Sequence, residues 1–216
     1  MEIIARIHND FPTKFGLPRQ AGLAPSLRSK IVFEPAYRVA EALRGLEDFS
    51  YVWLIWGFSA SEGWSPTVRP PRLGGNVRMG VFATRSPFRP NPIGLSSVRL
   101  ESIEKDGDNG LVLIVSGADL MDGTPIYDIK PYLPGADAHP DAADGFVGAN
   151  RQQLLDVEID PSLAVRLTGS QLATLREILA QDPRPAYHDD PDRVYGLSYA
   201  GLDIHFKVVE QQIKAF

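Results

Sequence analysis

Short apolar runs separated by turn signals recur along the first two thirds of the chain, and they predict many strands and few helices. The runs expected to form strands are residues 3–7, 31–33, 50–58, 79–84, 95–103, 111–115 and 126–129. The run at 50–58, SYVWLIWGF, is short and rich in aromatic residues, which favours a buried strand over a helix. The turn cluster EKDGDNG at 104–110 joins two of the runs into a hairpin. This pattern predicts a mostly antiparallel β-barrel or curled sheet.

One helix is expected in this part of the chain, at residues 35–46. Proline suits a first helical turn, and Val39, Leu43 and Leu46 recur at helical spacing. Gly45 weakens the end of this helix.

A small, polar and acidic segment at residues 136–150 is typical of a linker, so it divides the chain into residues 1–135 and 151–216. The second part predicts a small α/β domain with a strand at 153–159 and a helix that opens at Gly169, has Ser170 as its N-cap and ends near Gln181. A hairpin of residues 194–199 and 202–209 follows, with Asp203, His205 and Lys207 on its solvent face. The predicted fold class is therefore mostly β with α (α+β): an antiparallel N-terminal barrel plus a small α/β C-terminal domain.

Composition narrows the class of protein. The 216 residues carry a net charge of -5 and are 44% hydrophobic, which is ordinary for a globular protein. No apolar run approaches the roughly 20 residues of a membrane helix, so we expect no membrane span, and the first ten residues lack the pattern of a secretory signal. There is no cysteine, which excludes disulfides, thiolate nucleophiles and Cys-bound zinc, and we expect a cytoplasmic protein.

The segment from residue 69 to residue 100 opposes the acidic background of the chain. It holds Arg69, Arg72, Arg78, Arg85, Arg89 and Arg99. No Asp, Glu or Lys occurs between Glu62 and Glu101, and several prolines stiffen the backbone there. A shaped loop that carries arginines suits an anion or a planar polar ligand. A solvated proline-rich surface loop is the alternative, and it explains the prolines but not the absence of acids.

Other candidate chemistry is sparse. The four histidines are not at metal-ligand spacing, and GxSxG, HExxH and phosphate-loop motifs are absent, so we expect no metal site. LGGN at 73–76 is not a GxGxxG motif, which argues against a Rossmann fold. Asp119, Asp122 and Asp128 flank the sequence DGTP, where turn chemistry is the alternative to a catalytic role. Trp64 is either a rim residue or the cover of a ligand.

Several motifs resemble one known family. The run GVFATRSPFRPNPIGLS at 80–96 is the most specific, and it is joined by PRQ (18–20), RPPRLGGN (69–76), DGTPIYDIKPYLP (122–134) and QDPRPAY (181–187). Together they resemble the TsaA/TrmO family of tRNA adenine N6-methyltransferases. The resemblance implies a β-barrel enzyme that uses S-adenosylmethionine and forms a homodimer with the cofactor near the subunit interface. It also implies threonylcarbamoyl-adenosine beside the anticodon of a tRNA as the substrate, with the C-terminal domain helping to receive the tRNA.

Site residues follow from this resemblance. The implied cofactor contacts are Pro18, Arg19, Gln20, Ser59, Ala60, Arg85, Leu95, Asp122, Gly123, Thr124 and Pro125. The family carries a His-Gln pair where this chain has Ser59-Ala60, so contacts there come from the backbone or are lost. The candidate catalytic residues are Arg85, Asn91 and Asp122, and the candidate RNA contacts are Arg69, Arg72, Arg78, Arg89, Lys130, Arg184 and Tyr187.

The chemistry fits a chain without metal or thiol ligands. A sulfonium already carries an activated methyl group, so the enzyme has to align it with the acceptor nitrogen and exclude water. Asp122 or an aromatic face can balance the cation, and either a carboxylate or a backbone carbonyl can accept the proton of the amine.

Two alternatives stay open at this point. A non-catalytic RNA-binding barrel would use the same arginines without a methyl donor. A metal-dependent nucleotide hydrolase would use Asp122 and Asp128, although the arginine loop lacks a lysine and the acids are not clustered as metal ligands.

Overall fold

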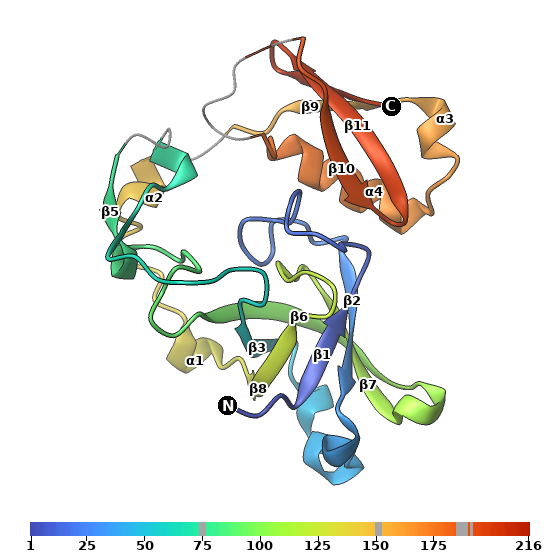
Figure 1. Ribbon diagram of the computed structural model, residues 1–216. Coiled ribbons are helices and arrows are strands. Elements are labelled where there is room, and N and C mark those ends of the chain that lie inside the picture. Colours follow the sequence, from blue (N-terminus) through green and yellow to red (C-terminus); the bar gives the residue numbers. More distant parts are fainter. Residues whose placement is uncertain (74–76, 150–152, 185–189, 191) are drawn as a thin grey trace.

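Six strands close into an antiparallel barrel in the order β1-β2-β7-β6-β3-β8 (Figure 1). The computed structural model describes residues 1–73, 77–149, 153–184, 190 and 192–216. The barrel strands are β1 (Ala5–His8), β2 (Arg28–Phe33), β3 (Tyr51–Gly57), β6 (Ile93–Lys105), β7 (Leu111–Ser116) and β8 (Pro125–Pro131). The predicted barrel and the predicted hairpin of β6 and β7 are confirmed.

The barrel interior follows from the two-residue period of its strands. In β3, Val52, Leu54 and Trp56 are buried, and the opposing residues of β6 alternate between buried and exposed positions in the same way. Gly94 of β6 lies opposite Trp56, and it leaves the space that the indole ring fills.

The helix expected at residues 35–46 is wrong. Three short 3-10 helices take its place: η1 (Pro35–Tyr37), η2 (Ala40–Leu43) and η3 (Leu46–Asp48). Extended backbone at Val39 and a left-handed Gly45 at φ 84° interrupt the helical hydrogen bonds. Leu43 and Leu46 nevertheless pack against the barrel core, so their spacing reflects burial rather than a continuous helix.

A long excursion between β3 and β6, residues 59–92, is called here the arginine arm. It contains β4 (Thr67–Val68), η4 (Pro71–Leu73), β5 (Met79–Gly80) and η5 (Val81–Ala83), with β4 and β5 forming a two-stranded sheet. The strand expected at 79–84 is thus only two residues long, because the chain turns into η5 after Gly80. The expected linker contains α2 (Phe146–Ala149), which lies beside the arm, and α1 (Pro134–Asp137) overlaps its start (Figure 1).

The C-terminal part folds as a four-stranded sheet with helices on one side. The strands run in the order β10 (Tyr195–Tyr199), β11 (Leu202–Val209), β12 (Gln212–Ala215) and β9 (Asp156–Ile159), and the helices are α3 (Pro161–Ala164) and α4 (Gly169–Ala180). The predicted hairpin and its solvent face are confirmed. The N-cap of α4 is Thr168 rather than Ser170, because the Thr168 side chain accepts from the Gln171 N–H in a capping box.

Residues 9–27, between β1 and β2, join the two parts. Phe11, Ala24 and Leu27 belong to the apolar core of the C-terminal sheet and α4. The Phe11 ring lies 4.7 Å from that of Tyr199, between centroids. Glu177 of α4 accepts hydrogen bonds from the Ser26 N–H at 2.9 Å and from its hydroxyl at 2.7 Å. The core of the C-terminal domain is therefore completed by the N-terminal segment.

Alanine at position 94 should destabilise the barrel. A Cβ at Gly94 would lie 2.2 Å from the Trp56 ring, which is only 7% exposed and has little room to move. We expect Gly94→Ala to lower the free energy of unfolding by about 1–3 kcal/mol, as overpacking does. Gly196→Ala in β10 is the control, because a Cβ there meets no atom within 4 Å. Thermal unfolding of both variants gives the measurement, and equal midpoints would contradict the packing argument.

Candidate functional site

A cavity of about 1150 Å³ lies where the arginine arm faces residues 19–20 and helix α2. Its lining residues are Arg19, Gln20, Ser65, Thr67, Val68, Arg69, Pro70, Pro71, Arg78, Phe82, Ala83, Thr84, Arg85, Ser86, Pro87, Phe88, Asp144, Phe146 and Val147. Aromatic side chains, prolines and guanidinium groups thus line one cavity, which suits a ligand with both a flat ring and an anionic group. A second cavity of about 470 Å³, near η2, contains none of the predicted site residues.

Three of the predicted cofactor residues meet in this cavity. Arg85 of the arm donates a hydrogen bond to the side-chain oxygen of Gln20. The neighbouring Arg19 donates to the backbone oxygen of Asp182 at 3.2 Å, just after α4. The PRQ motif at 18–20 therefore links the arm to the C-terminal domain.

The other predicted cofactor residues do not line this cavity. Leu95 faces outward on β6 and is 55% exposed, and the carbonyl of Ala60 accepts a hydrogen bond from Lys14. Pro18 and Ser59 also lie outside it, as do residues 122–125 at the start of β8 and the candidate catalytic residue Asn91.

The carboxylate of Asp122 is engaged with the end of β1. It accepts a hydrogen bond from the Asn9 N–H at 3.1 Å and lies 3.2 Å from Nδ1 of His8. Gly123 has a positive φ of 73°, so the DGTP sequence forms a tight turn there. Asp128 is instead 2.8 Å from Lys130. The two acids considered for a metal-dependent hydrolase therefore have separate partners.

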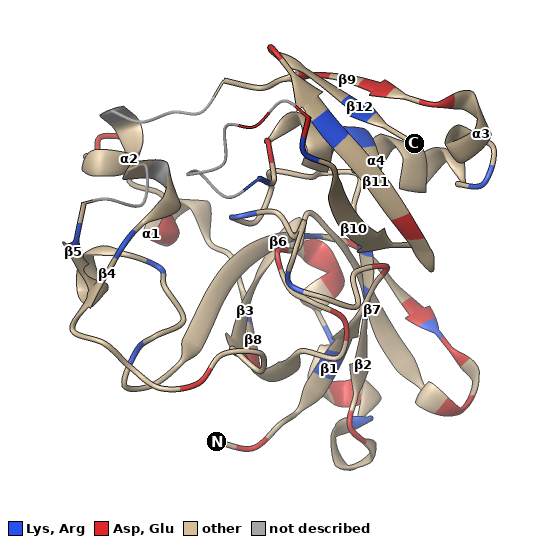
Figure 2. Ribbon diagram, turned by 45° about the horizontal axis from the view of Figure 1, so that its top comes forward, with Lys and Arg blue, Asp and Glu red and all other residues tan. Residues whose placement is uncertain are grey.

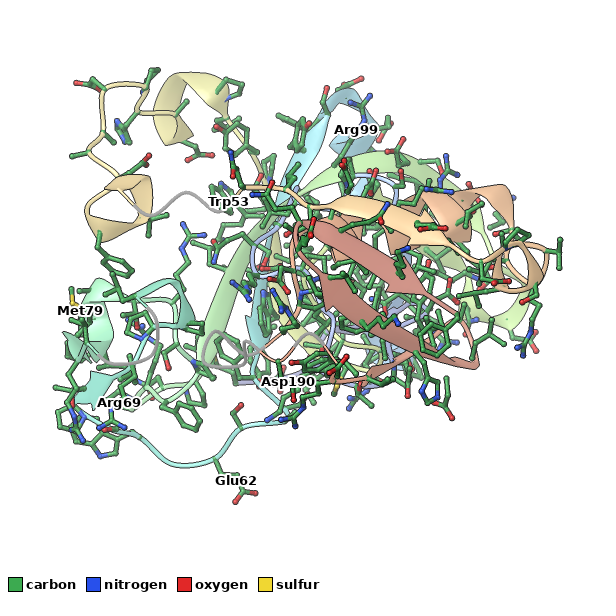
Figure 3. All side chains as sticks on the ribbon, turned by 90° about the horizontal axis from the view of Figure 1, so that it is seen from above. Trp53, Glu62, Arg69, Met79, Arg99 and Asp190 are labelled. Atoms are coloured by element: carbon green, nitrogen blue, oxygen red, sulfur yellow. The ribbon has the colours of Figure 1, made fainter. Side chains whose placement is uncertain are left out.

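The predicted RNA contacts do not form one patch. Arg69 and Arg78 line the cavity, and blue segments mark the arm around β4 and β5 in Figure 2. In Figure 3, Arg69 lies on the arm, far from Arg99 on the barrel, which is not among the predicted RNA contacts. Arg89 donates to the carbonyls of Val81 at 3.0 Å and Thr84 at 2.7 Å, so it braces the arm from within.

The remaining predicted RNA contacts are dispersed. Lys130 pairs with Asp128 on β8, and Arg184 forms a two-pronged pair with Asp182, with both distances 2.8 Å. The side chain of Arg72 and the residue Tyr187 lie outside the described part of the chain. Trp64 is 58% exposed and does not line the cavity.

A chain of hydrogen bonds that the sequence did not reveal leads from the barrel core toward Arg85. Nε1 of Trp56 donates to the Ser96 hydroxyl at 3.0 Å, and that hydroxyl donates to the Asp119 carboxylate at 2.6 Å. Burial raises the pKa of the Asp119 carboxyl, while the Ser96 hydrogen bond and the charge of Arg85 act in the opposite direction. The DGTP region drew attention to Asp119 but could not show its partners, because Ser96 lies 23 residues earlier in the chain.

Within the described ranges, no group of three or more His, Asp or Glu side chains could hold a metal ion. Across the same ranges, no helix is long and apolar enough to cross a membrane.

Comparison with known proteins identifies the class. Residues 6–138 match the family model described as the tRNA-methyltransferase O N-terminal domain, and residues 152–216 match the TrmO C-terminal domain. The barrel thus falls in a class of tRNA methyltransferases. The chain belongs to the TrmO family, which confirms the resemblance found in its sequence motifs.

Individual relatives agree with this assignment. The chain is 41% identical over 225 residues to a tRNA (adenine(37)-N6)-methyltransferase of Escherichia coli strain K12, covering 100% of this chain and 95% of that protein. It is 42% identical over 221 residues to a putative S-adenosylmethionine-dependent methyltransferase, RcsF, of Pseudomonas aeruginosa, covering 94% of this chain and 90% of the relative. A crystal structure of TrmO from Pseudomonas aeruginosa superposes with a TM-score of 0.81 at 36% identity, covering 99% and 94% of the two chains.

Proposed function

We propose that this S-adenosylmethionine-dependent tRNA (adenine-N6)-methyltransferase acts on the exocyclic amine of threonylcarbamoyl-adenosine, next to the anticodon. Family membership and the names of the relatives support methylation of tRNA adenine by a sulfonium donor. They favour neither a non-catalytic RNA-binding barrel nor a metal-dependent hydrolase. The threonylcarbamoyl group is our extension, taken from the family that the motifs resemble.

The proposed cofactor site rests on one observation. Arg19, Gln20 and Arg85 line the same cavity, and Arg85 donates a hydrogen bond to Gln20. Guanidinium groups bind carboxylates with two parallel hydrogen bonds, and the cofactor carries a carboxylate on its amino-acid part. Phe82 and Phe88 line the same cavity, and aromatic rings offer faces for a purine. The cofactor supplies an activated methyl group when bound, and these residues hold and orient it beside the arm. Asp122 and residues 123–125 lie outside this cavity, and their contact with the cofactor stays a prediction.

The arm and the C-terminal domain are the proposed tRNA-binding surfaces. Arg69 and Arg78 meet phosphates, and the unpaired bases of an anticodon loop are accessible without opening a duplex. We place cofactor binding in residues 1–135 and assistance to tRNA binding in residues 151–216.

A homodimer is part of the proposal, with the cofactor near the subunit interface. The outer face of β3 and β6 exposes Tyr51 (41%), Ile93 (36%) and Leu95 (55%), and apolar groups of this kind are suited to a partner subunit. Leu95 belongs to the proposed cofactor contacts, which ties that face to the site. We assign the enzyme to the cytoplasm, where its tRNA substrate resides.

Binding of S-adenosylmethionine should depend on the planar guanidinium group of Arg85, which offers two parallel N–H donors, and should not require a metal ion. Arg85→Lys keeps the charge but removes the fork, so we expect it to weaken binding by about 1–3 kcal/mol, the range for a hydrogen bond to a charged partner. Arg44→Lys is the control, because Arg44 is exposed and lies in the segment of η2 and η3. Calorimetry in EDTA gives the measurement. No heat signal for the unchanged protein would contradict the cofactor site.

The substrate is tested on tRNA from a strain that lacks this gene. Mass spectrometry of the nucleosides should show threonylcarbamoyl-adenosine without its N6-methyl group, and the purified enzyme should restore the methyl group. Transcripts that lack the threonylcarbamoyl group should not be methylated. Equal methylation of modified and unmodified tRNA would show that the substrate is plain adenosine.

Arg78 should contact tRNA mainly through charge. Replacing one phosphate contact lowers the slope of log affinity against log salt by about 1, so Arg78→Ala should weaken tRNA binding at low salt and flatten its salt dependence. Filter binding at several salt concentrations measures this slope, with Arg44→Ala as the control. An unchanged slope for Arg78→Ala would remove the arm from the proposed tRNA-binding surface.

A further inference from the structure

Three segments of the protein converge on the carboxylate of Asp119, in the connection between β7 and β8. Ser96 of β6 donates to it at 2.6 Å. The loop that carries Ala21 lies beside it, because the Gly22 N–H donates to the Gly117 carbonyl at 2.8 Å. The Ala21 backbone and the positive charge of Arg85 both act to lower the pKa of this carboxyl. These segments are distant in the sequence, so their common partner holds them together.

The partners of Asp119 adjoin the residues of the proposed cofactor site. Ala21 directly follows Gln20, whose side chain accepts from Arg85. Gly22 donates to the Gly117 carbonyl at 2.8 Å, which fixes the same loop to the connection that carries Asp119. A shift of Asp119 would therefore move the loop that presents Arg19 and Gln20.

Trp56 in the barrel core determines which atoms donate and which accept in the hydrogen bonds that lead to Asp119. Trp56 has only an N–H to offer, so the Ser96 hydroxyl accepts from it and must use its own hydrogen on Asp119. Trp56 itself is fixed by packing on Gly94. The rigid barrel thus orients Ser96, and Ser96 orients the carboxylate.

We propose that Asp119 is a positioning residue of the methyltransferase site, which fixes the loop of Arg19 and Gln20 relative to β6 and the arm. This inference rests on the proposed cofactor site at residues 19, 20 and 85. A carboxylate suits the role better than an amide, because both of its oxygens can accept hydrogen bonds. An asparagine side chain at this position would offer one accepting oxygen and a donor that faces another donor.

The test compares Asp119→Asn and Ser96→Ala with the unchanged enzyme. Both variants should raise the Kd and the KM for S-adenosylmethionine by about tenfold, the effect of losing one hydrogen bond to a charged group. The KM for tRNA and the kcat at saturating cofactor should stay within about twofold, since neither residue touches the tRNA or the reacting atoms in this proposal. Asp119→Glu should not restore binding, because the longer side chain displaces Ala21.

Asp106→Asn is the matched control. Asp106 is also an Asp that accepts two side-chain hydrogen bonds, from Lys30 and Asn109, but it lies in the turn between β6 and β7. This variant should leave all the kinetic constants unchanged. If Asp119→Asn does not fold, Ser96→Ala carries the test alone, because it removes a single hydroxyl from a small side chain.

The outcomes separate this inference from the proposed cofactor site. If Gln20→Ala and Arg85→Lys weaken cofactor binding while Asp119→Asn and Ser96→Ala do not, the role of Asp119 is overturned and the site stands. If Gln20→Ala and Arg85→Lys bind normally, the site is wrong and the inference falls with it. A lower unfolding temperature without a change in KM would show a structural role only, which also overturns the proposal. Non-additive losses in the double variant Asp119→Asn/Gln20→Ala would support action through the loop.

Discussion

The packing of residues 9–27 between two cores is the constraint on which the rest of the structure depends. On one side, Phe11, Ala24 and Leu27 are buried in the C-terminal core. On the other, Ala21 packs against the barrel core. Each core is stabilised by burial of apolar area, so displacing the segment would expose surface on both sides. The PRQ motif at 18–20 lies within this segment and takes its position from both domains.

This constraint gives the C-terminal domain a structural role next to the PRQ motif. Arg19 donates to the Asp182 carbonyl, and Asp182 also forms the two-pronged pair with Arg184. The segment after α4 therefore contacts the same loop that Asp119 holds from the barrel side. Residues 136–150 separate the two parts in the sequence, yet Phe11, Ala24 and Leu27 belong to the core of the C-terminal part. The two parts are thus better described as one unit around a common loop than as independent modules.

Local patterns predicted the elements whose burial repeats regularly, and they failed where the chain is irregular. The alternation in β11 reflects one buried face, and the short aromatic-rich run of β3 indicated a strand, so both strands were found. The spacing of Leu43 and Leu46 gave the same signal as a helix, although the backbone at Val39 and Gly45 breaks it. Ser170 and Thr168 are both good N-caps by residue type, and the capping box with Gln171 decides between them.

The candidate site could be predicted from the sequence only in part, because its contacts join segments that are distant in the chain. The absence of acids around six arginines and the family motifs pointed to Arg85 and to residues 18–20, and the structure brings Arg19, Gln20 and Arg85 together. Nothing local could show that Asp119, rather than Asp122, has its carboxylate next to them. That distinction depends on the register of β3 and β6, which places Trp56 and Ser96 inside the barrel on neighbouring strands.

The arm shows how a protein of net charge -5 can present arginines to a polyanion. Like charges repel, so a cluster of guanidinium groups needs either acids among them or internal partners that hold each one. The sequence contains no acid between Glu62 and Glu101, and three arginines of the arm use oxygen atoms of uncharged groups instead. Arg89 is held by two carbonyls, Arg78 by the Thr67 hydroxyl and Arg85 by the Gln20 amide. Uncharged partners orient these groups without neutralising them, so the positive potential stays available for a ligand. A carboxylate in direct contact with these guanidinium groups would cancel the positive potential. Asp119, in the connection between β7 and β8, instead acts on Arg85 through its charge.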